Sequence, residues 1–346
     1  MSTGAPRPVC VVVGSGSAGR RHAAALRALL PDHRLVVVRR AASLQPVEQL
    51  RELGAELVAT VDEAAALAPV LAIVAGPATS HARDAVAMLE AGASVLVEKP
   101  LAATAEDGRT LATAEVAAGR PVVLGYHLRF DDVASRFTEL VHQRIPHAGS
   151  FELRVGQYLG SWRPFLPVEG SVSARQELGG GVLLELSHEL DVVLDAFGPV
   201  ASVRAELRRD GAPTDGLVDT VAELELVMAS GATGRVHLDM VSDPPFRTWR
   251  AEGGGVRIEA DLLAGSIRAE GGGDPVDEQV PPGWRERAED RLVRHALAVA
   301  EGRALPVCGV EDGVAVLEVV EAARTSAARG DVVDVDRAAH AADGAA

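Results

Sequence analysis

The segment Val9–His22 constrains the fold of this chain more than any other stretch. It begins with five apolar residues, four of them valine, a run typical of a strand buried in a parallel sheet. The run ends in the motif Gly14-x-Gly16-x-x-Gly19, and residues 20–30 have a helix-forming composition that Pro31 ends. A glycine motif between such a strand and such a helix indicates a dinucleotide-binding turn.

Each glycine of the motif has its own physical role. Gly14 permits the tight turn, Gly16 leaves the backbone open to a pyrophosphate, and Gly19 lets the helix pack closely on the strand. The helix N-terminus offers N–H groups and a partial positive charge to the phosphates. The residues predicted to bind the dinucleotide here are Gly14, Ser15, Gly16, Ser17, Ala18 and Gly19. A purely structural turn is the alternative, because 35 glycines make chance matches common.

The end of the second predicted strand bears on the choice of cofactor. Residues 35–38 (Leu-Val-Val-Val) read as a strand that ends in Arg39-Arg40. A carboxylate at this place would bind the ribose 2′-hydroxyl of NAD, and none is present. Arg39, Arg40 and Ser43 instead suit a 2′-phosphate. The sequence therefore favours NADP(H) over NAD(H), with arginines that merely cap an exposed strand end as the alternative.

The composition excludes several classes of protein. A formal net charge of −15 argues against a nucleic-acid surface, which requires a basic patch. Cys10 and Cys308 are the only cysteines, which excludes a disulfide framework and a cysteine-based zinc site. The N-terminus lacks a secretory signal pattern, and Pro69 interrupts the longest apolar stretch, residues 64–78. We therefore expect a soluble, cytoplasmic chain with no metal, no nucleic-acid partner and no membrane partner.

The periodicity of the chain changes near residue 150. Strands and helices alternate before that point, which predicts an α/β Rossmann domain, a doubly wound parallel sheet, over residues 1–125. After it, period-two alternation and glycine-rich turns predict a large open, mostly antiparallel sheet with helices on one face. Residues 126–346 would thus form a second, α+β domain for substrate binding and oligomerisation, with closing helices within residues 284–330.

Four elements stand in the order and spacing of the Gfo/Idh/MocA oxidoreductases, the relatives of glucose–fructose oxidoreductase and inositol dehydrogenase. They are the motif of residues 14–22, the Pro77…His81 turn, Glu98-Lys99-Pro100 at a strand end, and residues 125–130. The chain resembles this family over essentially its whole length. The resemblance implies NAD(P)-dependent hydride transfer to or from a secondary alcohol or ketone of a sugar, cyclitol or nucleotide-sugar.

The resemblance also implies cofactor residues and an oligomer. The implied cofactor residues beyond the glycine loop are Gly76, Pro77, His81, Glu98, Lys99, Trp162 and Arg163. Trp162 has an alternative role as a buried tryptophan that anchors a loop. The uncovered face of the second sheet is expected to form a homo-dimer or tetramer, as in many proteins that the chain resembles.

A second group of polar residues follows Gly179-Gly180-Gly181. A continuous helix over residues 182–197 would place Glu185, His188, Asp191 and Asp195 on one side and the leucines on the other. On pattern alone a solvated helix face is the alternative. The resemblance implies that His188 transfers a proton with Glu185 as its acidic neighbour. Three residues separate Glu185 from His188, whereas the family's acid, more often Asp, precedes its His by four, which leaves the role of Glu185 open.

Lys99 lies at the carboxyl end of a predicted parallel strand, where open α/β sheets bind ligands. There it would hold the substrate oxygen, with a surface lysine before a turn as the alternative. The sequence leaves open whether the bond from Lys99 to Pro100 is cis. The polar residues predicted to form the substrate pocket are Lys99, Tyr126, His127, Arg129, Tyr158, Arg175 and His188.

Two other functions remain open at this point. A relative that retains its cofactor could carry out redox-neutral sugar chemistry. A dinucleotide-sensing protein without turnover would keep the glycine loop and lack a proton-transfer pair, so the presence of both Lys99 and His188 favours an enzyme. The identity of the substrate is not encoded in these generic hydrogen-bonding residues.

Overall fold

The computed structural model describes residues 7–40, 47–145, 149–162, 168, 171–210, 216 and 218–335. The chain divides into two compact units, and the division is not a single cut. The first unit contains Met1–His127 and Glu286–Val314, and the second contains Leu128–Arg285 and Ala315–Ala346. The sequence placed all the closing helices of residues 284–330 in the second domain, whereas residues 286–314 belong to the first unit.

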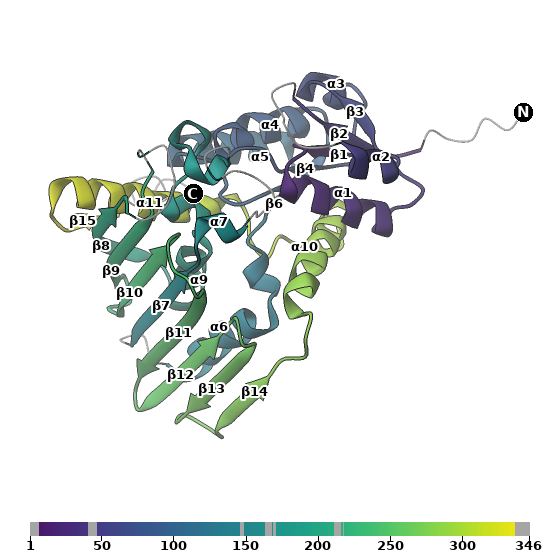
Figure 1. The fold of residues 1–346 in the computed structure, drawn as a ribbon. Coiled ribbons are helices and arrows are strands. Elements are labelled where there is room, and N and C mark those ends of the chain that lie inside the picture. Colours follow the sequence, from purple (N-terminus) through teal and green to yellow (C-terminus); the bar gives the residue numbers. More distant parts are fainter. Residues whose placement is uncertain are drawn as a thin grey trace, which may run out of the picture. The chain divides into compact units, whose positions relative to one another are not determined.

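Within the described residues, the first unit contains a six-stranded parallel sheet in the order β3-β2-β1-β4-β5-β6 (Figure 1). The strands are β1 (Val9–Val13), β2 (Arg34–Val38), β3 (Glu56–Val58), β4 (Leu71–Val74), β5 (Ser94–Val97) and β6 (Val122–Leu124). The strands β1, β4, β5 and β6 are buried along their whole length, as expected of a parallel sheet. The strand order reverses between β1 and β4, which confirms the doubly wound sheet and marks its switch point.

Helices connect these strands. They are α1 (Ser17–Leu29), α2 (Glu48–Glu52), α3 (Val61–Ala65), α4 (Ala78–Glu90) and α5 (Ala105–Ala118). The helix α10 (Trp284–Ala300), which belongs to the first unit from Glu286 onward, connects none of these strands. The helix α4 begins at Ala78, and its N-cap residue is Pro77, with φ −66° and ψ +145°. The hydroxyl of Ser80 donates to the Pro77 carbonyl over 3.1 Å.

The described part of the second unit forms a nine-stranded sheet in the order β14-β13-β12-β11-β7-β10-β9-β8-β15. Only the β7–β10 pair is parallel among these described strands, which confirms a mostly antiparallel sheet. The strands are β7 (Ser150–Gly156), β8 (Val200–Arg208), β9 (Val221–Met228), β10 (Thr233–Asp239), β11 (Phe246–Gly253), β12 (Val256–Asp261), β13 (Ser266–Glu270), β14 (Val276–Gln279) and β15 (Val333–Asp334).

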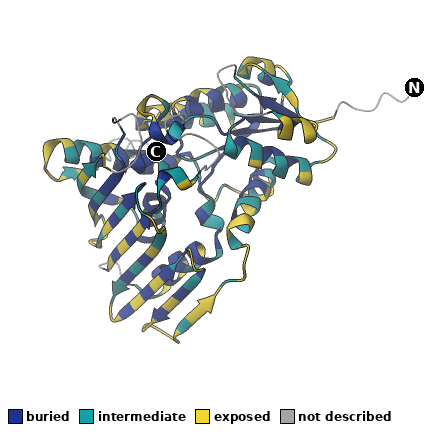
Figure 2. Cartoon of the chain, viewed as in Figure 1, coloured by how far each residue is buried: buried dark blue, intermediate teal, exposed yellow. Residues whose placement is uncertain are grey.

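Helices cover one face of this second sheet. The helix α6 (Asp132–Arg144) contacts β12 and β13, α8 (Val182–Glu185) contacts β9 and β10, and α9 (His188–Phe197) contacts β7. The ring of Phe137 from α6 meets that of Trp249 at 5.4 Å, and Phe151 stacks on Phe197 from α9 at 4.4 Å. Buried and exposed residues therefore alternate along the strands (Figure 2). The helices α7 (Leu159–Trp162) and α11 (Val310–Arg329) complete the elements used below.

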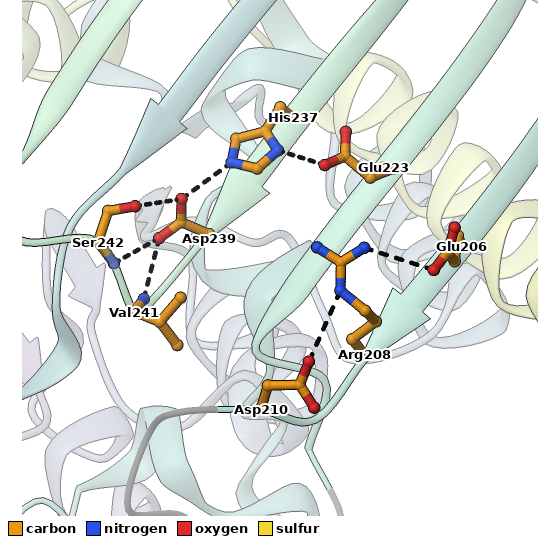
Figure 3. A network of polar contacts seen from close by, with 8 residues as sticks. All are labelled: Glu206, Arg208, Asp210, Glu223, His237, Asp239, Val241 and Ser242. Atoms are coloured by element: carbon orange, nitrogen blue, oxygen red, sulfur yellow. Dashed lines mark hydrogen bonds and ion pairs between the residues drawn. The ribbon is translucent and has the colours of Figure 1, made fainter.

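The opposite face of the second sheet carries a polar network (Figure 3). The ring of His237 lies 2.6 Å from a Glu223 oxygen through Nδ1 and 2.9 Å from an Asp239 oxygen through Nε2. Asp239 also accepts hydrogen bonds from the backbone N–H groups of Val241 and Ser242. The hydrogen bond to Asp239 and then that to Glu223 outweigh burial and raise the pKa of His237. The network therefore joins β9, β10 and the turn that follows β10.

Candidate cofactor and active site

The glycine loop connects β1 to α1 and is shaped as the sequence predicts. Gly14 has φ +117°, a conformation that only glycine adopts readily. A Cβ atom on Gly14 would lie 2.6 Å from the Ala75 carbonyl oxygen, and one on Gly19 would lie 2.0 Å from that of Gly14. A Cβ atom on Gly16 would meet nothing within 4 Å, so space remains where a pyrophosphate would approach. The loop therefore fits a dinucleotide.

The first turn of α1 adds to this fit. The N-cap residue is Gly16, and no side chain caps the helix there, so its first N–H groups are not bonded by a capping side chain. Ser15 is buried before the helix, and Ser17, Ala18 and Gly19 form its first turn. The arrangement offers backbone donors and the positive end of the helix dipole to phosphate groups.

The arginines predicted to bind a 2′-phosphate follow β2, and Ser43 lies outside the described residues. The backbone N–H of Arg39 donates to the Val58 carbonyl in β3 over 2.9 Å. The guanidinium of Arg40 donates to the carboxylate of Asp84 on α4, a side chain that is 1% exposed. The contact of these arginines with a phosphate stays a prediction, but Arg40 has a fixed protein partner that the sequence did not indicate.

His81 joins two loops at the carboxyl edge of the first sheet. Its Nδ1 lies 2.8 Å from the Pro100 carbonyl oxygen and its Nε2 lies 2.8 Å from that of Gly76. Burial lowers the pKa of His81, although these hydrogen bonds oppose the change. A neutral ring donates to one carbonyl at a time. His81 thus links the backbone at Gly76, which precedes the N-cap residue Pro77, to the backbone at Pro100. A direct contact between His81 and a cofactor stays a prediction.

Glu98 follows β5 and is engaged by the protein itself. A carboxylate oxygen lies 2.6 Å from His22 Nε2 on α1, and the other accepts the Lys99 N–H over 3.2 Å. Burial opposes ionisation of Glu98, but the hydrogen bond and charge of His22 outweigh it and lower the pKa to about 2. The sequence placed His22 in the glycine motif but predicted no role for it. A histidine on the side of α1 that faces the sheet could have indicated a buried polar partner.

Lys99 itself is half-buried at the carboxyl end of β5. Its bond to Pro100 is cis, one of the two states that the sequence left open. Lys99 belongs to the first compact unit and His188 to the second.

The helix predicted over residues 182–197 is interrupted. The helix α8 ends at Glu185 and α9 begins at His188. Leu186, with φ −105° and ψ +28°, departs from helical geometry, and the Ser187 hydroxyl donates back to the Leu184 carbonyl over 2.9 Å. A serine hydroxyl that donates to a nearby backbone carbonyl in this way competes with the backbone hydrogen bonds of a continuous helix. Glu185 and His188 therefore do not share one helix face, and the argument from their spacing was wrong.

The polar residues of α9 are not a solvated face either. His188, Glu189 and Asp191 are buried. Asp191 accepts two hydrogen bonds from Arg129, at 3.0 and 2.8 Å, and Arg129 also donates to Asp195 over 2.5 Å. A buried charge requires such compensation. Arg129, one of the residues predicted to form the substrate pocket, is thus paired with two carboxylates within the second unit.

Glu189 forms a further buried ion pair that the sequence reading missed. Its carboxylate accepts hydrogen bonds from Arg247 on β11 at 2.7 and 3.0 Å, and from the indole N–H of Trp249 at 3.4 Å. These contacts join α9 to the second sheet, and they fix the helix that begins with His188.

The remaining predicted pocket residues have different surroundings. Tyr126 is fully buried in the first unit, and His127 beside it is half-buried. In the second unit, Arg175 is exposed and pairs with Glu177 over 2.7 Å. Tyr158 lies against Gly160, where a Cβ atom would be 2.5 Å from its ring. Trp162 ends α7, and Arg163 lies outside the described residues. A common pocket for these side chains stays a prediction.

Two kinds of site are absent from the described ranges. No group of three or more His, Cys, Asp or Glu side chains in that part of the chain is arranged to hold a metal ion. No helix there is long and apolar enough to cross a bilayer.

The comparisons with known proteins agree in their family. Residues 9–126 match the family model described as "Oxidoreductase family, NAD-binding Rossmann fold", and residues 151–266 match the "GFO/IDH/MocA C-terminal domain". An inositol 2-dehydrogenase of Mycolicibacterium gilvum (strain PYR-GCK) is 29% identical over 94% of this chain and 93% of its own length. The scyllo-inositol 2-dehydrogenase (NADP(+)) of Bacillus subtilis (strain 168) is 27% identical over 74% of this chain and 76% of its own.

A solved structure has a similar fold over almost the whole chain. GenD2 from gentamicin A biosynthesis, in complex with NAD, superimposes with a TM-score of 0.77 at 25% identity, over 97% of this chain and 98% of that one. The glycine loop, the doubly wound sheet and the matched second domain together identify this chain as a member of the Gfo/Idh/MocA family of NAD(P)-binding oxidoreductases.

Proposed function

We propose that this oxidoreductase is a dehydrogenase that acts on a secondary alcohol or ketone of a sugar or cyclitol, with Lys99 and His188 as its proton-transfer pair. The observation that carries the proposal is the place of Lys99, two residues after the end of β5. In the sheet order, β5 lies beside β4, and β4 lies beside β1, which leads into the open Gly16 loop. Ligands of open α/β sheets bind outside the carboxyl ends of strands at such a switch point.

The curated relatives support the substrate class. The two that align with most of this chain are named as inositol 2-dehydrogenases, and inositols are cyclitols with secondary hydroxyl groups. A polyol substrate also agrees with the polar residues predicted around Lys99 and His188.

The proposed chemistry separates a hydride from a proton. A bound nicotinamide supplies the carbon that takes up or gives back the hydride. In oxidation, His188 accepts the hydroxyl proton as the carbonyl forms, while the Lys99 ammonium holds the substrate oxygen. In reduction, His188 returns the proton to that oxygen. The position of His188 at the start of α9 is fixed by the ion pairs of Glu189 and Asp191, which keep the helix against its neighbours.

A polyol panel tests this function directly. The purified protein is offered inositols, sugars and their ketones with each nicotinamide cofactor, and the absorbance of reduced nicotinamide is followed. Substrate-dependent turnover supports the proposal. Binding of the cofactor with no turnover across the panel would point to a sensing protein, and nicotinamide that survives dialysis would point to redox-neutral chemistry.

The proposal extends to NADP(H) as the preferred cofactor. Arg39 and Arg40 follow β2, where a carboxylate selective for NAD is absent. Of the two relatives that align with most of this chain, the one from Bacillus subtilis is named as an NADP(+) enzyme. Parallel titrations with NADPH and NADH measure this preference.

We also propose a homo-dimer or tetramer through the uncovered face of the second sheet. One row of side chains on this face alternates in charge from strand to strand across eight of the described strands. In sheet order this charged row is Arg204, Glu225, Arg235, Glu152, Arg250, Glu259, Arg268 and Asp277. Arg235 and Glu225 form an ion pair at 3.1 Å, as do Arg268 and Asp277.

The charged row is complementary to itself in one orientation. A two-fold axis parallel to the strands, between β7 and β11, would bring every residue of the row opposite a residue of contrary charge in a second copy. Arg235 would then face Glu259 of the second copy, and Arg204 would face its Asp277. A two-fold axis along the row would bring like charges together, which disfavours that arrangement.

A further inference from the structure

The side chain of Arg40 crosses the switch point of the first sheet. Arg40 follows β2 by two residues, and its guanidinium reaches Asp84 on α4, which follows β4. Strand β1 lies between β2 and β4, so the side chain passes the end of β1, where the glycine loop begins. A Cβ atom on Gly76 would be 3.3 Å from Arg40 Nη1, and one on Gly14 would be 3.0 Å from the Gly76 nitrogen. The guanidinium therefore lies beside the loop that fits the dinucleotide.

Asp84 holds this arginine in place. Its side chain is 1% exposed, and a buried carboxylate is stable only when it is hydrogen-bonded and paired. One oxygen accepts from Arg40, and the other accepts from Arg83 at 3.1 and 3.2 Å. Arg83 is 73% exposed, whereas Arg40 is 36% exposed, so Arg40 is the more enclosed partner. Arg40 and Arg83 carry two positive charges and Asp84 carries one negative charge, so these three side chains together have a net charge of +1.

We propose that Asp84 is a positioning residue for the 2′-phosphate of NADP(H), which it serves by fixing Arg40 at the switch point. The inference rests on the proposed preference for NADP(H). A guanidinium that is fixed before binding loses less side-chain freedom when a phosphate arrives, so the phosphate is bound more tightly. Asp84 itself is too deeply buried to bind the ribose hydroxyl of NAD(H), and its effect on that cofactor is correspondingly small.

The test compares ligands with and without the 2′-phosphate. Wild type, Asp84→Ala and Asp84→Asn are titrated with NADPH, NADH and adenosine 2′-monophosphate by calorimetry and nicotinamide fluorescence. In Asp84→Ala, we expect the affinity for NADPH and for adenosine 2′-monophosphate to fall about tenfold, and that for NADH by less than about twofold. Asp84→Asn, which keeps an acceptor oxygen but not the charge, gives a smaller loss. Arg83→Ala is the matched control, and we expect it to leave the NADPH-to-NADH ratio within about twofold of wild type.

A double-mutant cycle with Arg40→Met keeps the test decisive. If Asp84 acts through Arg40, the double variant with Asp84→Asn binds NADPH no more weakly than Arg40→Met alone. Additive losses, an equal loss for NADPH and NADH, or tighter NADPH binding in Asp84→Asn would each overturn the inference. A wild type that binds both cofactors equally overturns the cofactor preference and this inference together, whereas the dehydrogenase function is tested separately by turnover.

Discussion

The Nε2 atom of His22, on the helix that follows the glycine loop, lies 2.6 Å from a carboxylate oxygen of Glu98, the residue before Lys99. Both side chains are largely buried, at 7% and 15% exposure. The pair joins α1 to the end of β5, and the second Glu98 oxygen accepts the backbone N–H of Lys99. The helix proposed to bind the cofactor phosphates and the lysine proposed to hold the substrate oxygen are thereby held by one carboxylate.

This pair predicts an acid-dependent loss of stability. The pKa of Glu98 falls from an ordinary 4.5 to about 2 in the folded protein, so the stabilisation is complete above pH 4.5 and is lost as the pH falls towards 2. A shift of this size corresponds to about 3 kcal/mol. Denaturant unfolding of wild type and Glu98→Gln between neutral and acid pH measures it. We expect the two free energies of unfolding to converge in acid, and a constant difference would contradict the assignment.

The glycine loop predicts different outcomes for two similar substitutions. A Cβ atom on Gly16 meets open space, so Gly16→Ala should fold with little change in thermal midpoint but bind NADPH at least about tenfold more weakly. A Cβ atom on Gly19 would lie 2.0 Å from a backbone oxygen, so Gly19→Ala should lower the thermal midpoint itself. Gly16→Ala with unchanged NADPH affinity would show that the cofactor does not approach this loop.

The charged row predicts a rescue in the oligomer. Arg235→Glu should weaken self-association, because the new carboxylate would face Glu259 of the second copy. Adding Glu259→Arg on the same chain restores that contact, although it adds repulsion within each sheet from Arg250 and Arg268. Sedimentation velocity should therefore show recovered association while the thermal midpoint falls further. Because exposed pairs are screened, wild-type association should also weaken as salt rises. No recovery in the double variant would reject the two-fold arrangement.

His237 predicts a stability change at the opposite end of the pH scale. The hydrogen bond to Asp239, followed by that to Glu223, raises its pKa above an ordinary 6.5. The stabilisation is therefore complete below pH 6.5 and is lost as the pH rises through the higher folded value. Thermal unfolding of wild type and His237→Gln across this range should show a difference that shrinks in alkali. A difference that grows with pH would have the wrong sign.

Five strands of the first sheet were predictable because their signals are local, whereas β3 was missed because it has only three residues and none of them is buried. Valine runs such as residues 9–13 indicate buried parallel strands, and the glycine spacing fixes the turn between β1 and α1. The strands of the second sheet were predicted where apolar residues alternate strongly, as in β9. The strands β11, β13, β14 and β15 were missed; β14, for example, contains one apolar residue among its four, so no alternation marks it.

The polar pairs of the site were not predictable, because they join residues far apart in the chain. Arg40 and Asp84 are separated by 44 positions, and Arg129 and Asp191 by 62. A helical pattern also could not reveal that the Ser187 hydroxyl bonds back to Leu184 and divides α8 from α9. The sequence thus indicated which residue types could carry the chemistry, but their partners depend on the tertiary fold.

The most direct test of the proposed function is the rate of substrate-dependent nicotinamide reduction by wild type and His188→Asn on the best polyol of the panel. We predict turnover by wild type and a kcat lower by about 10²–10⁴ in His188→Asn, because general base catalysis is lost. NADPH affinity in that variant should stay within about twofold, since its cofactor residues are intact. A His188→Asn enzyme with wild-type kcat, or a wild type without turnover on any polyol or ketone, would contradict the proposed function.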